Sequence, residues 1–592
     1  MIDKKKTITV LAYISMAVFV IFLLRLWQLQ ILKGSYYRKQ SEKNRVRVFK
    51  IPAPRGIIFD RNGIPLVKNA PYFIASLIPG LSKKGLNLSG LSKLLDTSVE
   101  DLSEKIAKRK KHVLEPIRLK EGLSFSQVAR IEARRSDFPG LVVETEITRA
   151  YPYGSTGAHL IGYLSLPTEA QLRKGLFAGT PRGTFVGQWG VEALYDKRLK
   201  GVPGKRFIEV DALGRQLRTL KVVPPQKGEE LTLSVDIRTQ KTAEEAFKGK
   251  AGALMALDPQ SGEVLALVSL PSFDPNLFVR GISQRQWNRL RRNPGHPFLN
   301  RVFQSQYPPG SIFKIVTAIA ALEEGVVDEN FSVDCTGEIH VGIWKFSCWK
   351  GQGHGKTALR KALVESCDIY FYEIGRLLGM DRIAKYANAL GLGIAPGVKL
   401  SAERKGLIPT TSWKLRKKGI PWYLGETFNA AIGQGYVSIT PAQAALMISA
   451  IANGGNVYRP ELLKDQPGPE PIAKLSLSPK TLRIIRDSLV GVVEDRKGTG
   501  GTVRSEIVGI AGKTGTAQVI KIPESAKKKL ANKFRDHAWF VAYAPAEDPS
   551  IAVSVFVEHG GHGGETAGPI AKATIEAYMK SSGYYVETPA KN

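Results

Sequence analysis

Cysteine is scarce in this sequence. Only three cysteines occur in 592 residues, alongside 58 glycines and 34 prolines. So few cysteines exclude the disulfide frameworks that support small secreted domains. The glycine and proline counts exclude a collagen-like or low-complexity chain. The hydrophobic fraction of 43% excludes a disordered chain, and the length predicts several globular domains.

Acidic residues are outnumbered by basic ones. The sequence contains 85 Lys and Arg against 53 Asp and Glu, which is a formal net charge of +32. A charge of this size predicts an anionic partner, such as nucleic acid, a membrane surface or an acidic polymer. The sequence contains no zinc-knuckle, RNP or helix-turn-helix pattern. We therefore expect no nucleic-acid partner.

One apolar run near the N-terminus approaches the thickness of a membrane. Residues 8–24 are almost entirely apolar, and a helix of about 17 residues spans roughly 26 Å of the ~30 Å hydrocarbon core. No small-residue cleavage site follows the run. We therefore predict a retained transmembrane anchor over residues 7–32, behind a cytoplasmic tail of residues 1–6. The alternative is a buried core helix.

Basic residues flank this segment on both sides. Three lysines, at positions 4 to 6, precede it, and seven Lys or Arg follow between residues 33 and 50. Taken alone, the positive-inside rule places the C-terminal part of the chain in the cytoplasm. The chemistry implied by the family resemblance below overrules that orientation.

The rest of the chain divides into two regions. Residues 33–226 mix short strands, turns and basic helices and contain no catalytic cluster. Residues 224–228 have the composition of a linker, so we predict a second region over 227–582 and a tail at 583–592. Three stretches of the first region stand out: a strand running into a turn at 55–63, and segments 148–154 and 187–192.

The second region has strand signals at both ends. Apolar runs at 253–257 and 264–269 flank a turn-forming segment and predict a hairpin. Further strands are predicted at 537–543 and 550–557, and apolar helical stretches between 311 and about 392. This order predicts an α+β or mixed α/β domain whose N- and C-terminal strands pair in one sheet covered by helices.

The first of three short motifs is Ser311-x-x-Lys314, which follows Pro-Pro-Gly. The pattern alone is weakly specific, because it recurs at Ser347/Lys350 and Ser525/Lys528. Here, however, Ser311 opens a helix that is apolar nearly all round and is therefore buried. Lys314 then lies in or beside the core, on the same face as Ser311. Burial and the positive helix N-terminus disfavour a charged lysine there, as a general base requires. The alternative is an N-cap serine followed by a snorkelling lysine.

The second and third motifs are Ser366-Cys367-Asp368 and Lys513-Thr514-Gly515-Thr516. In the second, a hydroxyl and a carboxylate two residues apart can relay a proton and orient a lysine. A helix start or an Asx-type turn is the simpler explanation of that motif in isolation. The third lies on a predicted strand, where glycine lets a ligand approach the backbone and lysine and threonine can hold a carboxylate. A solvated edge strand is its alternative.

The order and spacing of the motifs are more informative than any one of them. The two serines lie 55 residues apart, and Lys513 lies 147 residues beyond Ser366. This succession resembles that of penicillin-binding proteins and serine β-lactamases. Further matches are residues 257–263, 272–276, 307–311, 512–517 and 537–540, and the stretches that begin at Arg55 and Arg149. The sequence is similar to class B penicillin-binding proteins of the elongation type, in which aspartate is typical at the position of Asp368.

The resemblance implies a fold class and a location. We expect an α+β multidomain protein with an N-terminal transmembrane helix and an elongated β-rich pedestal (dimerisation-type) domain over 33–226. A penicillin-binding/serine β-lactamase-like transpeptidase domain, with a central antiparallel sheet and a helical subdomain, follows over 227–582. Such a protein crosses the bacterial inner membrane once, with its catalytic domain on the periplasmic side. The substrate lies outside the cytoplasm, and long domains translocate largely regardless of charge.

The implied activity is peptidoglycan D,D-transpeptidation, which cross-links stem peptides during cell-wall elongation. Ser311 forms the acyl-enzyme, Lys314 is the general base and Ser366 relays the proton, with Asp368 and Lys513 as further catalytic residues. Substrate binding falls to Thr514, Gly515 and Thr516, and the oxyanion hole to the backbone N–H groups of Ser311 and Thr516. β-Lactam antibiotics acylate Ser311 as false substrates. The competing functions are a D,D-carboxypeptidase and a membrane-anchored protein that binds or hydrolyses β-lactams.

The resemblance also implies partners. The sequence contains no glycosyltransferase segment, so we expect a SEDS-family glycosyltransferase and other membrane proteins of the elongation complex. The substrates are peptidoglycan stem peptides on lipid II-derived glycan. The basic flank at residues 33–50 faces anionic lipid.

All three cysteines lie between residues 335 and 367. With His354, the residues Cys335, Cys348 and Cys367 have the spacing Cys-x12-Cys-x5-His-x12-Cys, and three thiolates with one imidazole form a closed zinc site. Some elongation-type relatives hold zinc at matching positions with aspartates in place of some cysteines, so Asp334 competes with Cys335 as a ligand. A Cys335–Cys348 disulfide and three unrelated core thiols are also compatible with the spacing. We expect a structural zinc ion and no organic cofactor.

Overall fold

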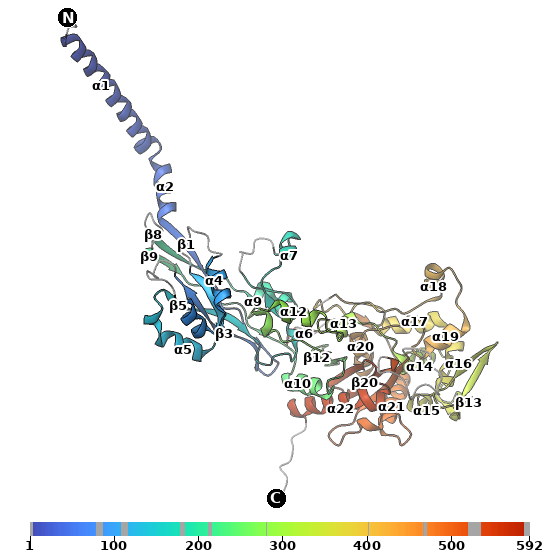
Figure 1. Cartoon of the computed structure of the whole chain (residues 1–592). Helices are drawn as coiled ribbons and strands as arrows, with labels where there is room; N and C mark the ends of the chain where they lie inside the picture. The colour runs from blue at the N-terminus through green and yellow to red at the C-terminus, as the bar shows by residue number, and fades with distance from the viewer. Residues whose placement is uncertain are drawn as a thin grey trace. The chain divides into compact units, whose positions relative to one another are not determined.

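The structure is a computed structural model that describes residues 4–78, 87–107, 116–177, 184–210, 216–279, 281–400, 402–464, 466, 470–518 and 534–584. Parts of the predicted tails, residues 1–3 and 585–592, and the Ser525/Lys528 pattern lie outside the described residues. The chain forms two compact units. One comprises Met1–Gly56 and Lys197–Glu229, and the other comprises Ile57–Asp196 and Glu230–Asn592. Figure 1 labels their elements. The domain boundaries drawn from the sequence remain predictions.

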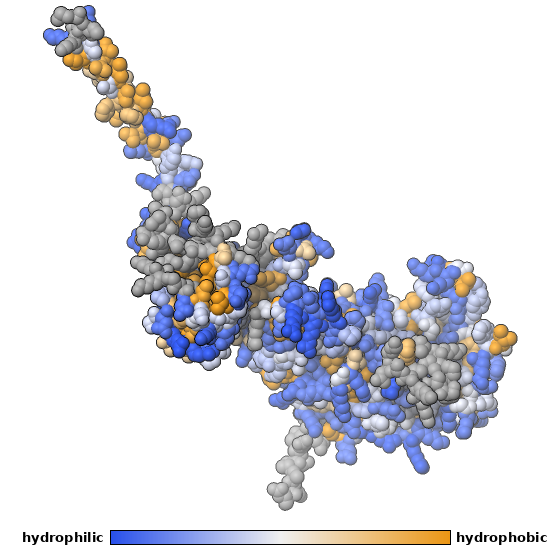
Figure 2. Space-filling view, viewed as in Figure 1, coloured by the Kyte–Doolittle hydropathy of each residue, from blue (hydrophilic) through white to orange (hydrophobic). Residues whose placement is uncertain are grey.

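The first unit carries the apolar N-terminal segment. Helix α1 (Lys4–Trp27) continues into a π-type turn, η1 (Gln28–Leu32). Within the described part of the chain, Lys5–Leu32 is the one helix long and apolar enough to cross a membrane. No part of it is buried against protein, and its apolar side chains are orange along the helix in Figure 2. The alternative of a buried core helix is therefore wrong, and the helix is a single-pass membrane anchor.

A three-stranded antiparallel sheet completes the first unit. Helix α2 (Gly34–Arg45) leads into β1 (Val46–Ile51), which pairs with β8 (Gly204–Val210). Strand β8 in turn pairs with β9 (Gln216–Val223).

The N-terminal part of the second unit is built around β3 (Pro65–Leu77). This strand pairs in antiparallel fashion with β2 (Ile58–Phe59), β4 (Ile117–Leu123) and β5 (Leu141–Ala150), and β10 (Leu231–Thr232) adds in parallel to β2. Helices α3 (Leu88–Leu95), α4 (Val99–Ala107) and α5 (Phe125–Ala133) share an apolar core with this sheet. Short elements follow: η2 (Arg135–Asp137), α6 (Ala158–Ile161), β6 (Leu164–Ser165), α7 (Glu169–Arg173), β7 (Val186–Gly187) and α8 (Gly190–Leu194). Helix α9 (Asp196–Leu199) begins with the last residue of this stretch, and its other residues belong to the first unit.

Two of the stretches that stand out in the sequence meet in a buried ion pair. Arg149 on β5 donates from Nε to Glu192 Oε1 on α8 at 2.6 Å, and both side chains are fully buried. Arg149 also donates to Asn69 Oδ1 on β3 at 3.2 Å. Buried charges require such partners. The role of these two stretches is therefore structural, because the pair ties α8 to the sheet.

The C-terminal part of the second unit contains a five-stranded antiparallel sheet in the order β12-β11-β21-β20-β19. The predicted hairpin is confirmed as β11 (Gly252–Leu257) and β12 (Val264–Leu270). Strand β11 pairs with β21 (Ile551–Val557), which confirms that the N- and C-terminal strands meet. Strands β20 (His537–Ala544) and β19 (Ala511–Ala517) complete the sheet, with β19 at its edge.

Helices cover both faces of this sheet. Helices α10 (Ile237–Ala246) and α22 (Gly563–Ser581) pack together on one face, in an apolar cluster with alternate residues of the strands. Helix α20 (Pro441–Ala452) packs against β11, β20 and β21 and lies outside that cluster, on the other face. Every residue of β11 and β21 is buried as a result.

A helical subdomain flanks the edge strand. It contains α14 (Lys314–Glu323), α15 (Leu359–Val364), α16 (Asp368–Leu378), α17 (Met380–Ala389), α18 (Thr411–Lys418), α19 (Leu424–Ala431) and α21 (Pro479–Glu494). The helical prediction over 311–392 is wrong between 332 and 358. Four short strands occur there: β13 (Ser332–Cys335), β14 (Glu338–Val341), β15 (Trp344–Ser347) and β16 (Gly355–Ala358). Glycines 337, 342, 353 and 355 adopt positive φ in this segment, which produces turns instead of a helix.

Short elements connect these layers. They are α11 (Asn276–Val279), α12 (Gln284–Arg291), α13 (Arg301–Gln304), η3 (Gly310–Phe313), β17 (Asn456–Val457), β18 (Ala473–Lys474) and η4 (Gly501–Val503).

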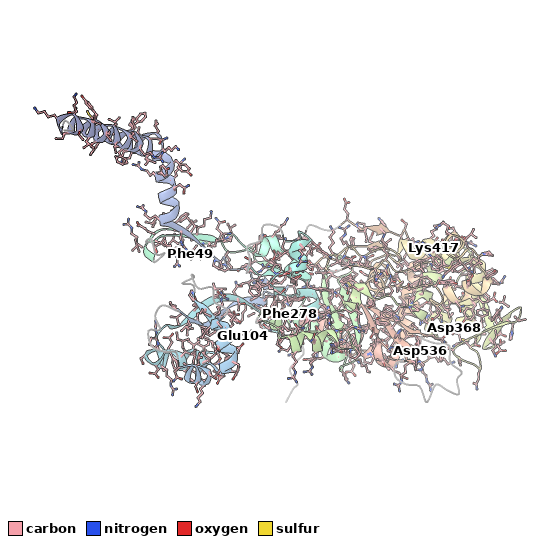
Figure 3. All side chains as sticks on the ribbon, turned by 45° about the horizontal axis from the view of Figure 1, so that its top comes forward. Phe49, Glu104, Phe278, Asp368, Lys417 and Asp536 are labelled. Carbon is pink, nitrogen blue, oxygen red and sulfur yellow. The ribbon has the colours of Figure 1, made fainter. Side chains whose placement is uncertain are left out.

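The two parts of the second unit are joined by polar and aromatic contacts. Asn62 Nδ2 donates to Asp236 Oδ2 at 2.7 Å. Aromatic rings from both parts gather around Phe273 and Phe278, and Tyr163 stacks on Phe278 with ring centroids 4.0 Å apart. Phe278 is labelled in Figure 3. Such contacts join the two parts in one compact unit.

Candidate active site

The Ser311 motif forms a tight turn against the edge strand. Residues Gly310–Phe313 are a 3₁₀ turn that leads into α14, and Gly310 has φ +57°. The Gly310 N–H donates to Gly433 O at 2.9 Å, and a Cβ atom at Gly310 would lie only 2.3 Å from Thr516 O. Glycine is therefore required for the turn to approach β19 this closely. Ser311 is partly exposed, and its hydroxyl has no hydrogen-bond partner among the described residues.

Lys314 is fully buried at the start of α14. Its Nζ donates to Asp368 Oδ1 at 2.7 Å, to Ser366 O at 2.8 Å and to Ser366 Oγ at 3.2 Å. The structure therefore brings the first and second motifs together around one amine. A snorkelling lysine is excluded by this burial.

The second motif joins a strained residue to a helix start. Ser366 has φ +56°, Cys367 occupies the N-cap position of α16, and Asp368 is the first residue of that helix. A carboxylate in this position is stabilised by the helix dipole. Left-handed backbone at a residue other than glycine costs on the order of 1–3 kcal/mol and persists only where the surroundings enforce it. The hydrogen bonds of Lys314 to Ser366 are part of that enforcement.

The third motif lies on β19, and Lys513 within it is fully buried. Its Nζ donates to Thr514 O at 3.2 Å. Burial, and then the nearby charge of Lys314, hold the pKa of Lys513 well below its usual value. A solvated edge strand is therefore excluded at this residue. A Cβ atom at Gly515 would lie 2.9 Å from Pro309 O, so Gly515 allows the Ser311 turn and β19 to lie in contact.

Three further polar residues touch the motifs and were not recognised in the sequence. Thr499 shares a hydrogen bond of 2.8 Å between its Oγ1 and that of Thr514, and Gln434 Nε2 donates to Thr516 O at 3.2 Å. Trp349 donates its backbone N–H to Asp368 Oδ2 at 2.8 Å. No local pattern marks these residues; the one signal for Trp349 is that it follows Cys348.

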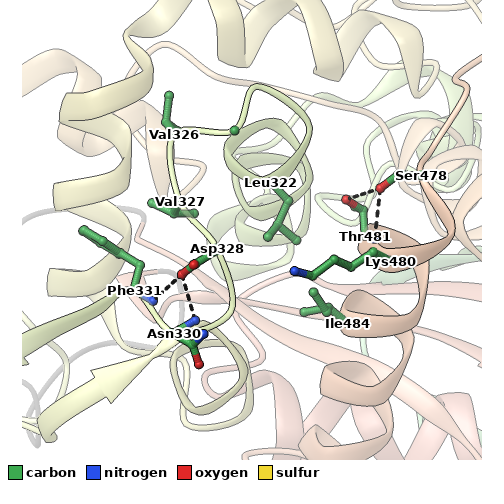
Figure 4. A pocket seen from close by; sticks show the side chains of 11 residues that line it. Leu322, Val326, Val327, Asp328, Asn330, Phe331, Ser478, Lys480, Thr481 and Ile484 are labelled. Atoms are coloured by element: carbon green, nitrogen blue, oxygen red, sulfur yellow. Dashed lines mark hydrogen bonds between the residues drawn. The ribbon is translucent and has the colours of Figure 1, made fainter.

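A cavity of about 690 Å³ lies away from the motifs, between the end of α14 and the start of α21 (Figure 4). Leu322, Asp328 and Ile484 are among its lining residues, and no residue of the three motifs is. The Asp328 carboxylate accepts from the N–H groups of Asn330 and Phe331, at 3.0 and 2.9 Å. The cavity is therefore separate from the active site.

Cys335, Cys348, His354 and Cys367 converge in a second cluster. All four are buried, and their ligand atoms lie within 4.8 Å of one another. His354 Nδ1 lies 3.5 Å from the sulfur atoms of Cys335 and Cys348. Ligand atoms of a tetrahedral zinc site with ~2.3 Å Zn–S bonds are about 3.8 Å apart, so the donor set and its spacing fit zinc. The thiol of Cys367 and the backbone N–H of Asp368 lower the pKa of Cys348, and a thiolate is the form that binds a metal.

The geometry of this cluster also bears on the competing interpretations of the cysteines. All three thiols are free, and they lie together rather than apart. Asp334 is exposed, whereas Cys335 is buried, because successive side chains of a strand such as β13 point to opposite faces. Cys335, and not Asp334, therefore belongs to the cluster.

Comparisons with known proteins agree with this fold and these motifs. The Penicillin-binding Protein dimerisation domain matches residues 50–233, and the Penicillin binding protein transpeptidase domain matches residues 252–576. The chain is 36% identical to the peptidoglycan D,D-transpeptidase MrdA of Acinetobacter baumannii, over 93% of this chain and 84% of that protein.

Solved structures show the same relationship. Penicillin-binding protein PBP2 of Helicobacter pylori, solved in complex with MreC, is 31% identical with a TM-score of 0.79, over 91% of this chain and 99% of that one. A chain of a peptidoglycan synthase complex, studied for its coordination of polymerization and crosslinking, is 32% identical with a TM-score of 0.73. That match covers 99% of this chain and 100% of the other.

The fold and the three converging motifs define a serine-type acyl transferase, and the chain belongs to the penicillin-binding protein family, with a dimerisation and a transpeptidase domain. Its activity is peptidoglycan D,D-transpeptidation. The relative named above is called a transpeptidase, so the comparisons support this activity and give no support to a carboxypeptidase.

Proposed function

We propose that Ser311 is the nucleophile of this transpeptidase. Its Oγ attacks the carbonyl carbon of the penultimate D-Ala of a stem peptide, and the bond to the nitrogen of the terminal D-Ala breaks. The Ser311 proton passes to Lys314 and reaches the leaving amine through Ser366. An amine of a neighbouring stem peptide then attacks the ester, which forms the cross-link and restores Ser311.

The observation that carries this proposal is the environment of Lys314. Its buried amine contacts both polar side chains of the second motif, with Asp368 Oδ1 at 2.7 Å. Asp368 offsets the positive charge that forms when Lys314 takes the Ser311 proton. Ser366 Oγ, at 3.2 Å from Nζ, is placed to hand the proton on.

Binding of the substrate falls to the edge strand. Backbone N–H groups of Ser311 and Thr516 form the oxyanion hole, and one such donor contributes about 2.7–4 kcal/mol to transition-state stabilisation. Lys513, Thr514 and Thr516 hold the substrate carboxylate, with Gly515 leaving room for the Ser311 turn.

Fluorescent penicillin labelling of the full chain in detergent tests the nucleophile. We expect wild type to label and Ser311→Ala not to label. Ser347→Ala is the matched control, because Ser347 begins a second Ser-x-x-Lys pattern and is exposed. Equal labelling of wild type and Ser311→Ala contradicts the proposal. Release of free D-Ala without cross-links from lipid II-derived glycan favours a carboxypeptidase.

The membrane orientation is a second part of the proposal. We infer a bacterial inner-membrane protein whose catalytic domain lies on the periplasmic side, because the peptidoglycan substrate is there. Fusions of a β-lactamase reporter to the C-terminus and to the N-terminus distinguish the two orientations. Ampicillin resistance from the C-terminal fusion is expected, and resistance from the N-terminal fusion alone reverses the assignment.

The same reasoning proposes partners. The chain has no glycan-polymerising segment of its own, so a SEDS-family glycosyltransferase and other elongation-complex membrane proteins supply and organise the glycan. Relatives were solved with MreC and in a peptidoglycan synthase complex, which supports partners of this kind. Co-purification with the glycosyltransferase in detergent tests whether the anchor contributes to this binding. We expect the full chain to co-purify with it, and a chain that lacks residues 1–32 not to.

We also propose that Cys335, Cys348, His354 and Cys367 hold a structural zinc ion. Zinc would tie β13, the β15–β16 segment and α16 together, and Cys367 lies between the two polar residues of the second motif. It would therefore brace Ser366 and Asp368. Elemental analysis should find about one zinc per chain, and chelation should lower the thermal midpoint. Metal-free protein with one titratable thiol would favour the Cys335–Cys348 disulfide instead.

A further inference from the structure

Trp349 contributes two N–H donors to the second motif. Its backbone N–H donates to Asp368 Oδ2 at 2.8 Å. Its indole Nε1–H points at two carbonyl oxygens, those of Ser366 at 3.0 Å and Glu365 at 3.1 Å. These acceptors belong to the turn that carries the motif.

Trp349 donates hydrogen bonds to the same two residues that accept hydrogen bonds from Lys314. Ser366 O accepts from Lys314 Nζ at 2.8 Å and from the Trp349 indole at 3.0 Å. Asp368 Oδ1 accepts from Lys314 Nζ at 2.7 Å, and Oδ2 accepts from the Trp349 N–H at 2.8 Å. Lys314 and Trp349 therefore donate hydrogen bonds to the same two residues of this turn.

The exposure of the Trp349 ring indicates that apolar packing is not its main contribution to the structure. Trp349 is 61% exposed, and the apolar stabilisation that a tryptophan supplies scales with the area removed from water. Its polar end, by contrast, reaches buried acceptors. The Ser366 turn needs such support, because its φ of +56° is strained for a side-chain-bearing residue.

We propose that Trp349 is a positioning residue for acylation. It acts through the Ser366 carbonyl and the Asp368 carboxylate. These two contacts keep the Ser366 hydroxyl and the Lys314 amine in the position that the reaction at Ser311 requires. This role rests on the function proposed above for Ser311, Lys314 and Ser366. Trp349 itself does not take part in the bond changes.

A purely structural role is the competing explanation. The Trp349 ring packs edge-on against His354, with centroids 5.6 Å apart, so its loss could act through the cysteine–histidine cluster. Trp349→Phe separates the two roles, because phenylalanine keeps an aromatic ring and the backbone N–H but has a smaller ring without the indole donor.

The experiment measures two constants for a fluorescent penicillin on the full chain in detergent: the non-covalent dissociation constant and the first-order acylation constant. For Trp349→Phe we expect the acylation constant to fall about tenfold, the order of one lost hydrogen bond. The dissociation constant, the zinc content and the thermal midpoint should stay at wild-type values. Trp344→Phe is the matched control, since Trp344 is 68% exposed on the neighbouring strand β15, and it should acylate like wild type.

Three results would overturn the inference. The first is an unchanged acylation constant in Trp349→Phe. The second is an equal fall of the acylation constant in Trp344→Phe. The third is a fall of the acylation constant in Trp349→Phe that is accompanied by loss of zinc or by a lower thermal midpoint. Ser311→Ala, measured beside them, keeps the proposed function separate. If Ser311→Ala labels, the nucleophile is wrong, whereas wild-type acylation in Trp349→Phe alone removes only the role of Trp349.

Discussion

Asp368 offers the sharpest test of the active-site geometry, through its replacement by asparagine and by alanine. Each carboxylate oxygen accepts from a different donor, Oδ1 from Lys314 Nζ at 2.7 Å and Oδ2 from the Trp349 N–H at 2.8 Å. An asparagine has the same shape but one acceptor oxygen in place of two. Whichever way the amide is turned, its NH₂ group faces one of these two donors.

The structure sets the scale of both changes. A buried donor left without an acceptor costs about 1–3 kcal/mol, so Asp368→Asn should lower the free energy of unfolding by that amount. Alanine removes the carboxylate that pairs with a fully buried lysine, and loss of one partner of a buried ion pair costs about 3–5 kcal/mol. If 1–2 kcal/mol of the asparagine effect is expressed in the transition state, acylation slows about 5- to 30-fold.

Two assays on the full chain in detergent check this prediction. Urea unfolding followed by tryptophan fluorescence measures stability, and the rate of labelling by a fluorescent penicillin measures acylation. Asp328→Asn is the control, because Asp328 accepts from two backbone N–H groups in an exposed loop beside the separate cavity, and it should acylate normally. Wild-type stability and rate in Asp368→Asn would refute the two-donor geometry.

Two further predictions concern a close backbone contact and a buried ion pair. Gly310→Ala should lower stability by about 2–5 kcal/mol and abolish penicillin labelling, because a Cβ atom would lie 2.3 Å from Thr516 O at a positive φ. Gly419→Ala is the control, because Gly419 is also at positive φ but has nothing within 4 Å of a Cβ atom; it should lower stability by only about 1–2 kcal/mol and label normally. The same loss of labelling in both variants would contradict the role of the close approach between Gly310 and Thr516. Glu192→Ala should destabilise the β3–β5 part by about 3–5 kcal/mol in urea unfolding, because it leaves Arg149 buried without its carboxylate. Glu229→Ala, which breaks an exposed pair with Arg198, should change stability much less.

Several features could be predicted from local sequence because each depends on neighbours in the chain. The all-apolar helix after Ser311 requires Lys314 to be buried, and Lys314 is fully buried. The apolar runs at both ends of the second region predict paired strands, and β11 pairs with β21. The apolar N-terminal run predicts an anchor, and its helix is not buried against any part of the chain that the structure describes.

Other features were predicted wrongly or stayed open. The helix predicted between β13 and β16 is absent because glycines at positive φ turn the chain there. The choice between Asp334 and Cys335 could not be made from spacing alone. It was decided by the pleat of β13, which buries one side chain and exposes the other. The one signal that Trp349 carries is its place after Cys348, and that signal does not show that its N–H groups reach the second motif.

The sequence by itself determined the membrane anchor, the pairing of the N- and C-terminal strands of the second region and the three motifs, because apolar runs and motif order are properties of the linear chain. Only the tertiary structure decided which groups meet. Lys314 finds its carboxylate 54 residues away, and the four residues of the cysteine–histidine cluster come from the end of β13, the segment between β15 and β16, and the start of α16. Hydrogen bonds act over about 3 Å, so chemistry of this kind exists only once the fold has brought distant side chains within that range.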